Sequence, residues 1–99
     1  MVQFKWDDDK NVINIKKHGI DFFEAASVFL DKYALNIYDT DHSEDEDRFI
    51  IIGLSQTLKV LVVCHCYRQN DEVIRIISAR KATKNETNEY IKRGDDYER

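Results

Sequence analysis

The first third of the chain shows the spacing of apolar residues that is typical of two amphipathic helices. Residues 8–18 are mostly polar with a narrow apolar stripe, preceded by Asp7, a favourable N-cap residue, and followed by Gly19. Asp21, with Glu24 three residues later, forms a capping-box pattern that opens a second helix. The apolar face of this second helix is dense, so we expect it to lie at the centre of the core. Its members are Phe22, Ala25, Ala26, Phe29 and Leu30.

From residue 34 onward the apolar residues follow the pattern of β-strands. Residues 35–38 form a short extended segment, which a polar loop follows. Two runs rich in β-branched residues, 48–53 and 59–65, are joined by a short connection, which predicts a hairpin. A second hairpin turns at residues 69–71 and leads into a fourth strand over 73–80. We therefore expect a meander of four antiparallel strands.

A last helix completes the predicted fold. Thr83 and Glu86 repeat the capping-box pattern and open a helix that we expect to end at Gly94. Residues 4–6 are interpreted as a short extended entry. The order of elements predicts an α+β domain, in which a four-stranded antiparallel sheet is packed by two N-terminal helices and one C-terminal helix. A length of 99 residues fits a single domain over residues 1–99.

The composition is that of a small protein whose core needs no covalent staples, because apolar residues make up 42% of the chain. Cys64 and Cys66 lie on one face of a predicted strand, with poor geometry for a disulfide between them. We interpret them as reduced core thiols; a zinc site completed by a histidine is the alternative. The chain starts without an apolar signal stretch and has no segment of membrane-spanning length, so we expect a cytoplasmic protein with no membrane association.

The charge is unevenly distributed along the chain. The net charge of −4 argues against nucleic acid as a partner. However, all six charged residues in 39–47 are acidic, whereas residues 73–93 carry six lysines and arginines against two glutamates. A surface divided in this way can still present a basic face to RNA.

Short motifs occur along the chain in a specific order. They are Phe4-x-Trp6-Asp7-x-x-Lys10-x-x-x-Asn14, Lys17-His18-Gly19, Phe22-x-Glu24-Ala25-Ala26-x-Val28-Phe29, Asp41-His42-Ser43-Glu44-x-Glu46-x-Arg48, Ile52-Gly53-Leu54-Ser55 and Ile74-Arg75-Ile76-Ile77-Ser78-Ala79-Arg80-Lys81-Ala82. Taken together in this order and spacing, they resemble the BrnT toxin family from Phe4 to about Tyr90.

The resemblance implies a fold, an activity and a partner. It implies a RelE-like fold and an endoribonuclease that cleaves RNA without a metal or other cofactor, and that arrests growth when it is not neutralised. It also implies a BrnA-type antitoxin, a ribbon-helix-helix protein that binds the promoter of the shared operon. Operator DNA would then be reached only through the complex with the antitoxin.

Cleavage of RNA without a metal requires fixed cations, because negative charge accumulates on the phosphorane formed when the 2′-OH attacks phosphorus. Arginine suits this task, since its planar fork binds phosphate through two hydrogen bonds and keeps its charge. Four arginines lie on or at the ends of predicted strands. They are Arg48, Arg68, Arg75 and Arg80.

Residue parity distinguishes two of these arginines. On an unbulged strand, Arg75 and Arg80 point to opposite faces of the sheet, and helices cover one face. Arg80 lies at the strand end beside two lysines, so we predict that it binds phosphate; a structural ion pair is the alternative. Arg75 is flanked by isoleucines, and we expect it to pair with an acid such as Glu46 or Glu24.

The predicted catalytic residues are Arg80, Arg48, Glu46 and His42. Glu46 and Arg48 share a strand face at positions i and i+2, so the carboxylate can orient the guanidinium; an ordinary surface pair is the alternative. His42, in the acidic loop, can act as an acid–base group. His18 is interpreted as a cation or packed ring at a helix end. His65 fits a core position as well as a functional one.

A further set of residues is predicted to bind RNA. They are Lys81, Lys84, Arg68, Lys10 and Trp6. Trp6 and Lys10 lie together at the start of the first helix, where an aromatic ring can stack on an unpaired base; a core role for Trp6 is the alternative.

Two other classes of function remain open at this point. The first is a catalytically inactive RelE-like interaction module that acts with its antitoxin in transcriptional autoregulation, which the acidic net charge favours. The second is a small metalloenzyme that uses His42 with Asp41 and Glu44, although adjacent acids in a loop are usually a solvated turn. A gene for a ribbon-helix-helix protein beside this one would favour the toxin.

Overall fold

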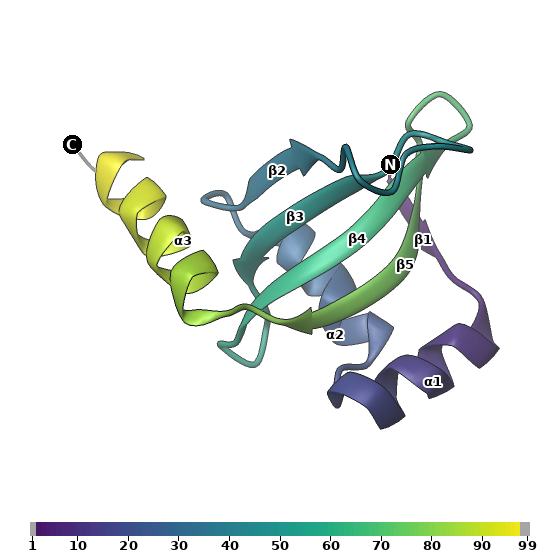
Figure 1. Cartoon of the computed structure of the whole chain (residues 1–99), viewed down its shortest axis with the longest axis horizontal. Helices are drawn as coiled ribbons and strands as arrows, with labels where there is room; N and C mark the ends of the chain where they lie inside the picture. Colours follow the sequence, from purple (N-terminus) through teal and green to yellow (C-terminus); the bar gives the residue numbers. More distant parts are fainter. Residues whose placement is uncertain (1, 98–99) are drawn as a thin grey trace.

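The structure, a computed structural model that describes residues 2–97, is a five-stranded sheet with one short helix behind one face and the first helix beside an edge of the sheet (Figure 1). The elements are β1 (Gln3–Lys5), α1 (Asp8–His18), α2 (Phe22–Ser27), the 3-10 turn η1 (Val28–Leu30), β2 (Leu35–Tyr38), β3 (Phe49–Leu54), β4 (Val60–Arg68), β5 (Val73–Lys81) and α3 (Lys84–Tyr97). Within the described residues no helix lies over the opposite face, which is turned to the viewer in Figure 1. We call this the open face.

The sheet contains one strand more than the sequence predicts. Its order is β1-β5-β4-β3-β2, with β1 parallel to β5 and the other neighbours antiparallel. The expected extended entry is an edge strand, since Gln3 N–H donates to the carbonyl of Glu72 at 2.9 Å. The α+β class is confirmed, but the purely antiparallel four-stranded sheet was wrong. A strand of three residues is too short for its alternation to be recognised, and only its partner β5 defines it.

The predicted ends of α1 are confirmed. The carboxylate of Asp7 accepts hydrogen bonds from two backbone N–H groups of the first turn, and Gly19 ends the helix with φ at 71°. Asn14, 5% exposed, joins this helix to the sheet. Its amide donates to the carbonyl of Ala79 at 2.8 Å and accepts from the Ala79 N–H at 3.1 Å. This buried amide fixes β5 one residue before Arg80.

The start of α2 is confirmed only in part. Asp21 caps the helix by accepting from the N–H of Phe23 at 2.9 Å. Glu24 does not complete a capping box, because its carboxylate instead accepts hydrogen bonds from Ser55 and Thr57 in the turn between β3 and β4. Burial alone would raise the pKa of Glu24, but these hydrogen bonds outweigh it and lower the pKa.

The core lies between the sheet and the segment formed by Ile20, α2 and η1. Helix α1, which was expected to pack there too, contributes no residue to it, because it lies along the edge of β5. The buried residues of the core are Ile20, Phe22, Ala25, Val28, Ile51, Leu61, Val63, Ile76 and Ala79. Leu30 was wrongly placed there: the helix gives way to η1 before this residue, and its side chain is 86% exposed. Gly53 permits η1 to approach β3, because a Cβ at this position would lie 2.8 Å from Val28 Cγ1.

The C-terminal helix begins as predicted but continues further. Thr83 N–H donates to the carboxylate of Glu86 at 2.8 Å, and Glu86 N–H donates to the Thr83 hydroxyl at 3.2 Å, which confirms the capping box. The helix passes through Gly94 to Tyr97, so the expected end at Gly94 was wrong. A helical glycine costs only about 1 kcal/mol relative to alanine.

Helix α3 projects to one side of the sheet instead of packing across it (Figure 1). One link back to the sheet is the hydroxyl of Tyr90, which donates to Asp31 Oδ2 at 2.5 Å. Burial, together with this carboxylate, raises the pKa of Tyr90 to about 12. In the described part of the chain, no helix is both long and apolar enough to cross a membrane.

His65 is a core residue. The ring is fully buried on the helix-covered face of β4, with the rings of Phe29 and Phe49 next to it. Nδ1 donates to the carbonyl of Val63 at 3.1 Å, so Nε2 of the neutral ring is an acceptor, 3.4 Å from the hydroxyl of Tyr67. Burial lowers the pKa of His65, because the imidazolium would lose its hydration.

This histidine should make the free energy of unfolding depend on pH. Its pKa is about 6.5 in the unfolded chain and lower in the folded one, so the unfolded state binds the proton first as the pH falls. The free energy of unfolding therefore has its full value above the pKa of the unfolded state. It decreases as the pH falls from there to the pKa of the folded state, by up to about 1.4 kcal/mol per pH unit. Urea unfolding at about pH 7.5 and 5.5 measures the effect. His65→Phe should flatten it, and an unchanged pH dependence in this variant would contradict the assignment.

Candidate active site on the open sheet face

A β-bulge decides which face the arginines of β5 occupy. The ladder pairs Cys64 with Ser78 but His65 with Ile76, so β5 has one extra residue at this point. Beyond the bulge, Arg80 lies opposite Val62, and before it Arg75 lies opposite Cys66. Paired residues share a face, and Val62, Cys64 and Cys66 all point to the open one. The predicted separation of Arg75 and Arg80 was therefore wrong.

The expected ion pair of Arg75 is also absent among the described residues. The carboxylate of Glu24 is bound by Ser55 and Thr57, and that of Glu46 by two other arginines. Arg75 instead contributes to a cavity of about 400 Å³ at the β1 edge of the sheet. The other lining residues are Phe4, Lys5, Trp6, Asp8, Asn11 and Phe23.

A cavity of about 340 Å³ on the open face gathers most of the predicted chemistry. Its lining residues are Lys17, His18, Asp39, His42, Arg48, Ile50, Val62, Cys64, Ile77, Ser78, Ala79 and Arg80. Three permanent cations and two imidazoles face one carboxylate. The apolar side chains come from β3, β4 and β5. Arg80 also comes from β5, whereas the other charged and imidazole groups come from α1 and from the loop between β2 and β3. Such a cavity suits an anionic ligand.

The acidic loop after β2 is folded back on itself. Asp39 N–H donates to the carbonyl of Arg48 at 2.8 Å, and Arg48 N–H donates to the hydroxyl of Ser43 at 3.0 Å. These bonds close residues 39–48 into a loop at the end of the β2–β3 pair. As a result, His42 and Arg48 are held at the same cavity, although they are six positions apart along the chain.

His42 and Asp39 form a histidine–carboxylate pair. Nδ1 of His42 lies 3.0 Å from Asp39 Oδ2 and 3.1 Å from Oδ1. The side chain of Asp39 is 6% exposed and that of His42 is 66% exposed. A carboxylate can only accept, so it fixes the proton on Nδ1 and leaves Nε2 of the neutral ring as a proton acceptor. This is the arrangement that a general base requires.

Glu46 joins two of the predicted arginines. Its Oε1 lies 3.7 Å from Arg48 Nε, and its Oε2 lies 2.9 Å from Arg68 Nη2. The predicted contact between Glu46 and Arg48 therefore exists, although both residues precede β3 and do not lie on a strand. Arg48 comes from the loop before β3 and Arg68 from the end of β4, and the shared carboxylate holds them together.

Arg80 is held by the helix that follows its strand. Its Nη1 and Nη2 donate to the two carboxylate oxygens of Glu86 at 2.7 and 2.9 Å. The hydrogen bond raises the pKa of Arg80 and lowers that of Glu86 to about 2, so both stay charged at neutral pH. The arginine thus has a structural ion pair and a place at the cavity, two roles that the sequence presents as alternatives.

The predicted RNA-binding residues are spread around the molecule. Lys81 pairs with Leu61 in the ladder and so lies on the face opposite to Arg80. Lys84 and Lys10 are exposed on α3 and α1. Trp6 is half-buried beside the rings of Phe22 and Phe23. Arg68 lies near Glu46 at a neighbouring cavity of about 610 Å³. Of the predicted site, the structure brings together Arg80, Arg48 and His42, with Glu46 beside them.

The sequence reasoning missed Lys17 and Asp39. Lys17 reaches the cavity from the last turn of α1, and it belongs to the Lys17-His18-Gly19 motif, which was a usable signal. Asp39 was counted only as one acid of a solvated run, but it is the buried one. An acid three residues before a histidine gives no sign of burial in the sequence.

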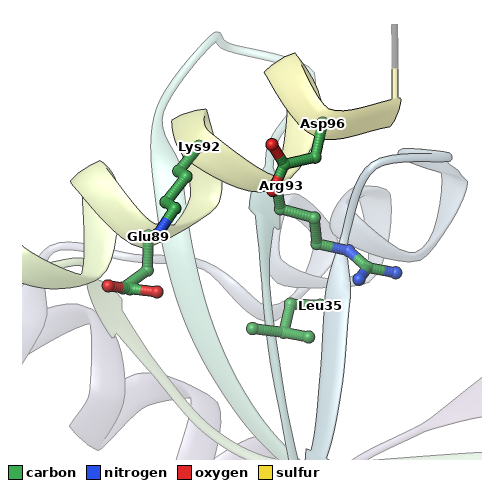
Figure 2. Close-up of a pocket in the computed structure, with 5 residues that line it drawn as sticks. All are labelled: Leu35, Glu89, Lys92, Arg93 and Asp96. Carbon is green, nitrogen blue, oxygen red and sulfur yellow. The ribbon is translucent and has the colours of Figure 1, made fainter. Parts of the chain in front are cut away.

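A larger cavity, of about 580 Å³, lies between α3 and β2 (Figure 2). Figure 2 shows Arg93 reaching from the helix toward the strand that carries Leu35. Lys92 and Arg93 are matched there by Glu89 and Asp96, so the lining has no excess of cations. We therefore place the candidate site at the cavity on the open face.

The described residues contain no cluster of three or more His, Cys, Asp or Glu side chains placed to hold a metal. Cys64 and Cys66 are both free thiols, and burial raises the pKa of each. Cys66 is buried, but the core position expected for Cys64 was wrong, because Cys64 is only partly buried and lines the cavity on the open face. Asp41 and Glu44 lie with His42 around a shallow cavity but are not arranged as a ligand set.

Comparison with known proteins identifies the chain. Over residues 6–86 it matches the family described as the ribonuclease toxin BrnT of type II toxin–antitoxin systems. The class of protein is therefore a ribonuclease toxin that works with an antitoxin partner. This chain belongs to the BrnT family.

A solved structure agrees with this assignment. The chain is similar to the ribonuclease toxin BrnT of Brucella abortus, whose crystal structure was determined at 1.1 Å. The two are 26% identical with a TM-score of 0.64, over 85% of this chain and 100% of that one. None of the curated proteins matches the chain.

Proposed function

We propose that the protein is a metal-independent endoribonuclease of the RelE-like type that arrests growth by cleaving cytoplasmic RNA. The observation that carries the proposal is the cavity on the open face, which brings Arg48 and Arg80 to the same place as the His42–Asp39 pair. A proton acceptor beside two phosphate-binding groups is what attack by a 2′-OH requires.

The proposed reaction is an internal transfer at phosphorus. The RNA 2′-oxygen forms a bond to the adjacent phosphorus while the bond from phosphorus to the 5′-oxygen breaks. His42 Nε2 takes the proton from the 2′-OH, and the departing 5′-oxygen takes up a proton from water. Arg48 and Arg80 bind the other phosphate oxygens, on which negative charge accumulates.

The remaining predicted residues have supporting roles in the proposal. Glu46 orients Arg48 and Arg68 through the contacts described above. Arg68, with exposed cations such as Lys84 and Lys10, binds phosphates on either side of the cleaved bond, and Trp6 stacks on a base. These contacts supply affinity, which should weaken as salt rises.

The chain should cleave RNA in the presence of EDTA and leave 2′,3′-cyclic phosphate or 3′-phosphate ends. The reason is that the cavity offers arginines and an imidazole as the groups that act on phosphate. Analysis of the ends of a labelled RNA by mass spectrometry measures this. Products with 3′-hydroxyl ends, or cleavage that requires added Mg²⁺, would exclude this mechanism. Absence of any cleavage, together with promoter repression by the complex, would favour the inactive interaction module.

The proposed partner is a BrnA-type ribbon-helix-helix antitoxin, through which the complex reaches operator DNA. An acidic antitoxin segment that covers Arg80 and Arg48 would deny RNA access to the cavity. Complementary charge mainly raises the association rate. That rate should therefore fall as salt rises from about 50 to 500 mM, because the Debye length shrinks to a few ångströms. Stopped-flow mixing measures it, and an association rate indifferent to salt would contradict the model.

A further inference from the structure

We propose that Glu86 is a positioning residue, which holds Arg80 by its two terminal nitrogens and leaves its Nε edge open for an RNA phosphate. The proposal rests on the proposed function, in which Arg80 binds the phosphate, and adds a residue from α3 to the site. Glu86 itself does not line the cavity; it acts through Arg80.

The hydrogen bonds of the Arg80 guanidinium show which edge is free. A guanidinium has five N–H groups: one on Nε and two on each terminal nitrogen. Nη1 uses both of its own, on Glu86 Oε1 at 2.7 Å and on the carbonyl of Lys81 at 3.3 Å. Nη2 uses one, on Glu86 Oε2 at 2.9 Å. Within residues 2–97 the two donors left over are Nε–H and the second Nη2–H, and these lie on one edge of the group.

The free edge has the geometry that phosphate prefers. Two parallel N–H groups on one edge of a guanidinium match two oxygens of a phosphate, as in fork-to-fork pairs. Because Arg80 lines the cavity, a phosphate bound there can use this edge without displacing Glu86. The carboxylate and the phosphate are then two ligands of the same arginine on different edges.

Glu86 is itself fixed before any substrate arrives. Its carboxylate accepts the N–H of Thr83, and its own N–H donates to the Thr83 hydroxyl. On the other side, the buried amide of Asn14 holds the backbone of Ala79, next to Arg80. A long side chain held at both ends loses less conformational freedom when it binds phosphate, which favours binding in the productive geometry.

Two variants separate positioning of Arg80 from capping of α3. Glu86→Gln keeps one oxygen that can accept the Thr83 N–H, but its NH₂ group cannot accept from Nη2. Thr83→Ala removes the hydroxyl half of the same capping box and leaves the bidentate contact with Arg80 intact. Each variant is assayed for kcat and KM with a single-stranded RNA, and its thermal midpoint is measured.

Glu86→Gln should lower kcat/KM by about 10- to 100-fold, which is the typical result of a displaced catalytic group. Thr83→Ala should stay within about threefold of the wild type, although loss of a cap lowers stability. Equal losses of activity in the two variants would mean that helix capping explains the effect, and would overturn the proposal. Unchanged or faster cleavage by Glu86→Gln would show that Glu86 competes with phosphate, which overturns it too.

A binding measurement distinguishes failure of this proposal from failure of the proposed nuclease activity. If the wild-type chain does not cleave RNA, the proposed nuclease activity fails by itself. The positioning role is then decided by NMR, with a 2′-O-methyl RNA that lacks the attacking hydroxyl. The Nε–H signal of Arg80 should shift on titration of the wild type and shift less in Glu86→Gln at the same concentrations. A signal that does not respond in the wild type, or responds equally in both proteins, overturns the proposal.

Discussion

Replacing Arg80 by alanine should lower the rate of RNA cleavage by about 10²- to 10³-fold, the usual cost of removing one donor to a developing oxyanion. Arg80 reaches the cavity only because the bulge in β5 turns it to the open face. The free edge of its guanidinium offers two donors to phosphate, and no other described residue of β5 places a permanent cation at this cavity.

Stability should change little in the same variant. The Arg80 side chain is 42% exposed, and such pairs contribute under about 1 kcal/mol, so the thermal midpoint should fall by only a few degrees. Arg80→Lys keeps the charge but lacks the fork, and should recover only part of the activity. Labelled RNA under single-turnover conditions gives the rates. A cleavage rate of Arg80→Ala within threefold of the wild-type rate would show that Arg80 does not take part in the reaction.

Arg75→Ala provides the matched control on the same strand and face. No acid among the described residues pairs with Arg75, and it lies at the β1 edge, outside the proposed active site. Its replacement should therefore leave the thermal midpoint nearly unchanged and reduce cleavage far less than Arg80→Ala does. A strong loss of stability would restore the structural role that the sequence first indicated for Arg75.

Replacing His42 by alanine should lower kcat by about 10²- to 10⁴-fold, the range that a general base contributes. Asp39→Asn should produce a smaller loss, because the amide oxygen can still accept from Nδ1 but no longer stabilises the imidazolium by charge. KM should change little in both, since neither group binds the ground-state phosphate. Stopped assays over a range of RNA concentration separate kcat from KM.

Asp41→Asn is the control for this pair. It removes one negative charge from the same loop, but among the described residues the hydrogen bonds of the imidazole to a carboxylate go to Asp39 and not to Asp41. We expect its kcat to match the wild type. Equal losses of kcat in Asp39→Asn and Asp41→Asn would show that the loop acts through its overall charge. The histidine–carboxylate pair would then have no specific role in catalysis.

Local chemistry explains why much of the fold was predictable. Asp7 and Asp21 cap their helices through their nearest neighbours, and the Thr83–Glu86 box closes over three residues. The ladder from β3 to β5 follows from apolar alternation between short turns. In each case the interacting residues lie close together in the sequence, so the local sequence pattern is enough to predict the structure. Glu24 shows the limit of this reasoning, because its partners lie 31 and 33 residues away.

The site was only partly predictable for the same reason. Arg80, Arg48, Glu46 and His42 were chosen by residue type and family resemblance, and three of them line one cavity with Glu46 beside them. Parity counting failed at β5, because it assumes a regular ladder and one extra residue reverses every later side chain.

The sequence by itself determined where the helices start, the central antiparallel ladder and the membership of the BrnT family, since these depend on neighbours in the chain and on ordered motifs. Tertiary structure alone decided three other features. They are the pairing of β1 with β5, the bulge that turns Arg75 and Arg80 to one face, and the burial of Asp39 beside His42. Each depends on contacts between distant segments, and such contacts form only when the burial of a common core offsets the loss of chain entropy.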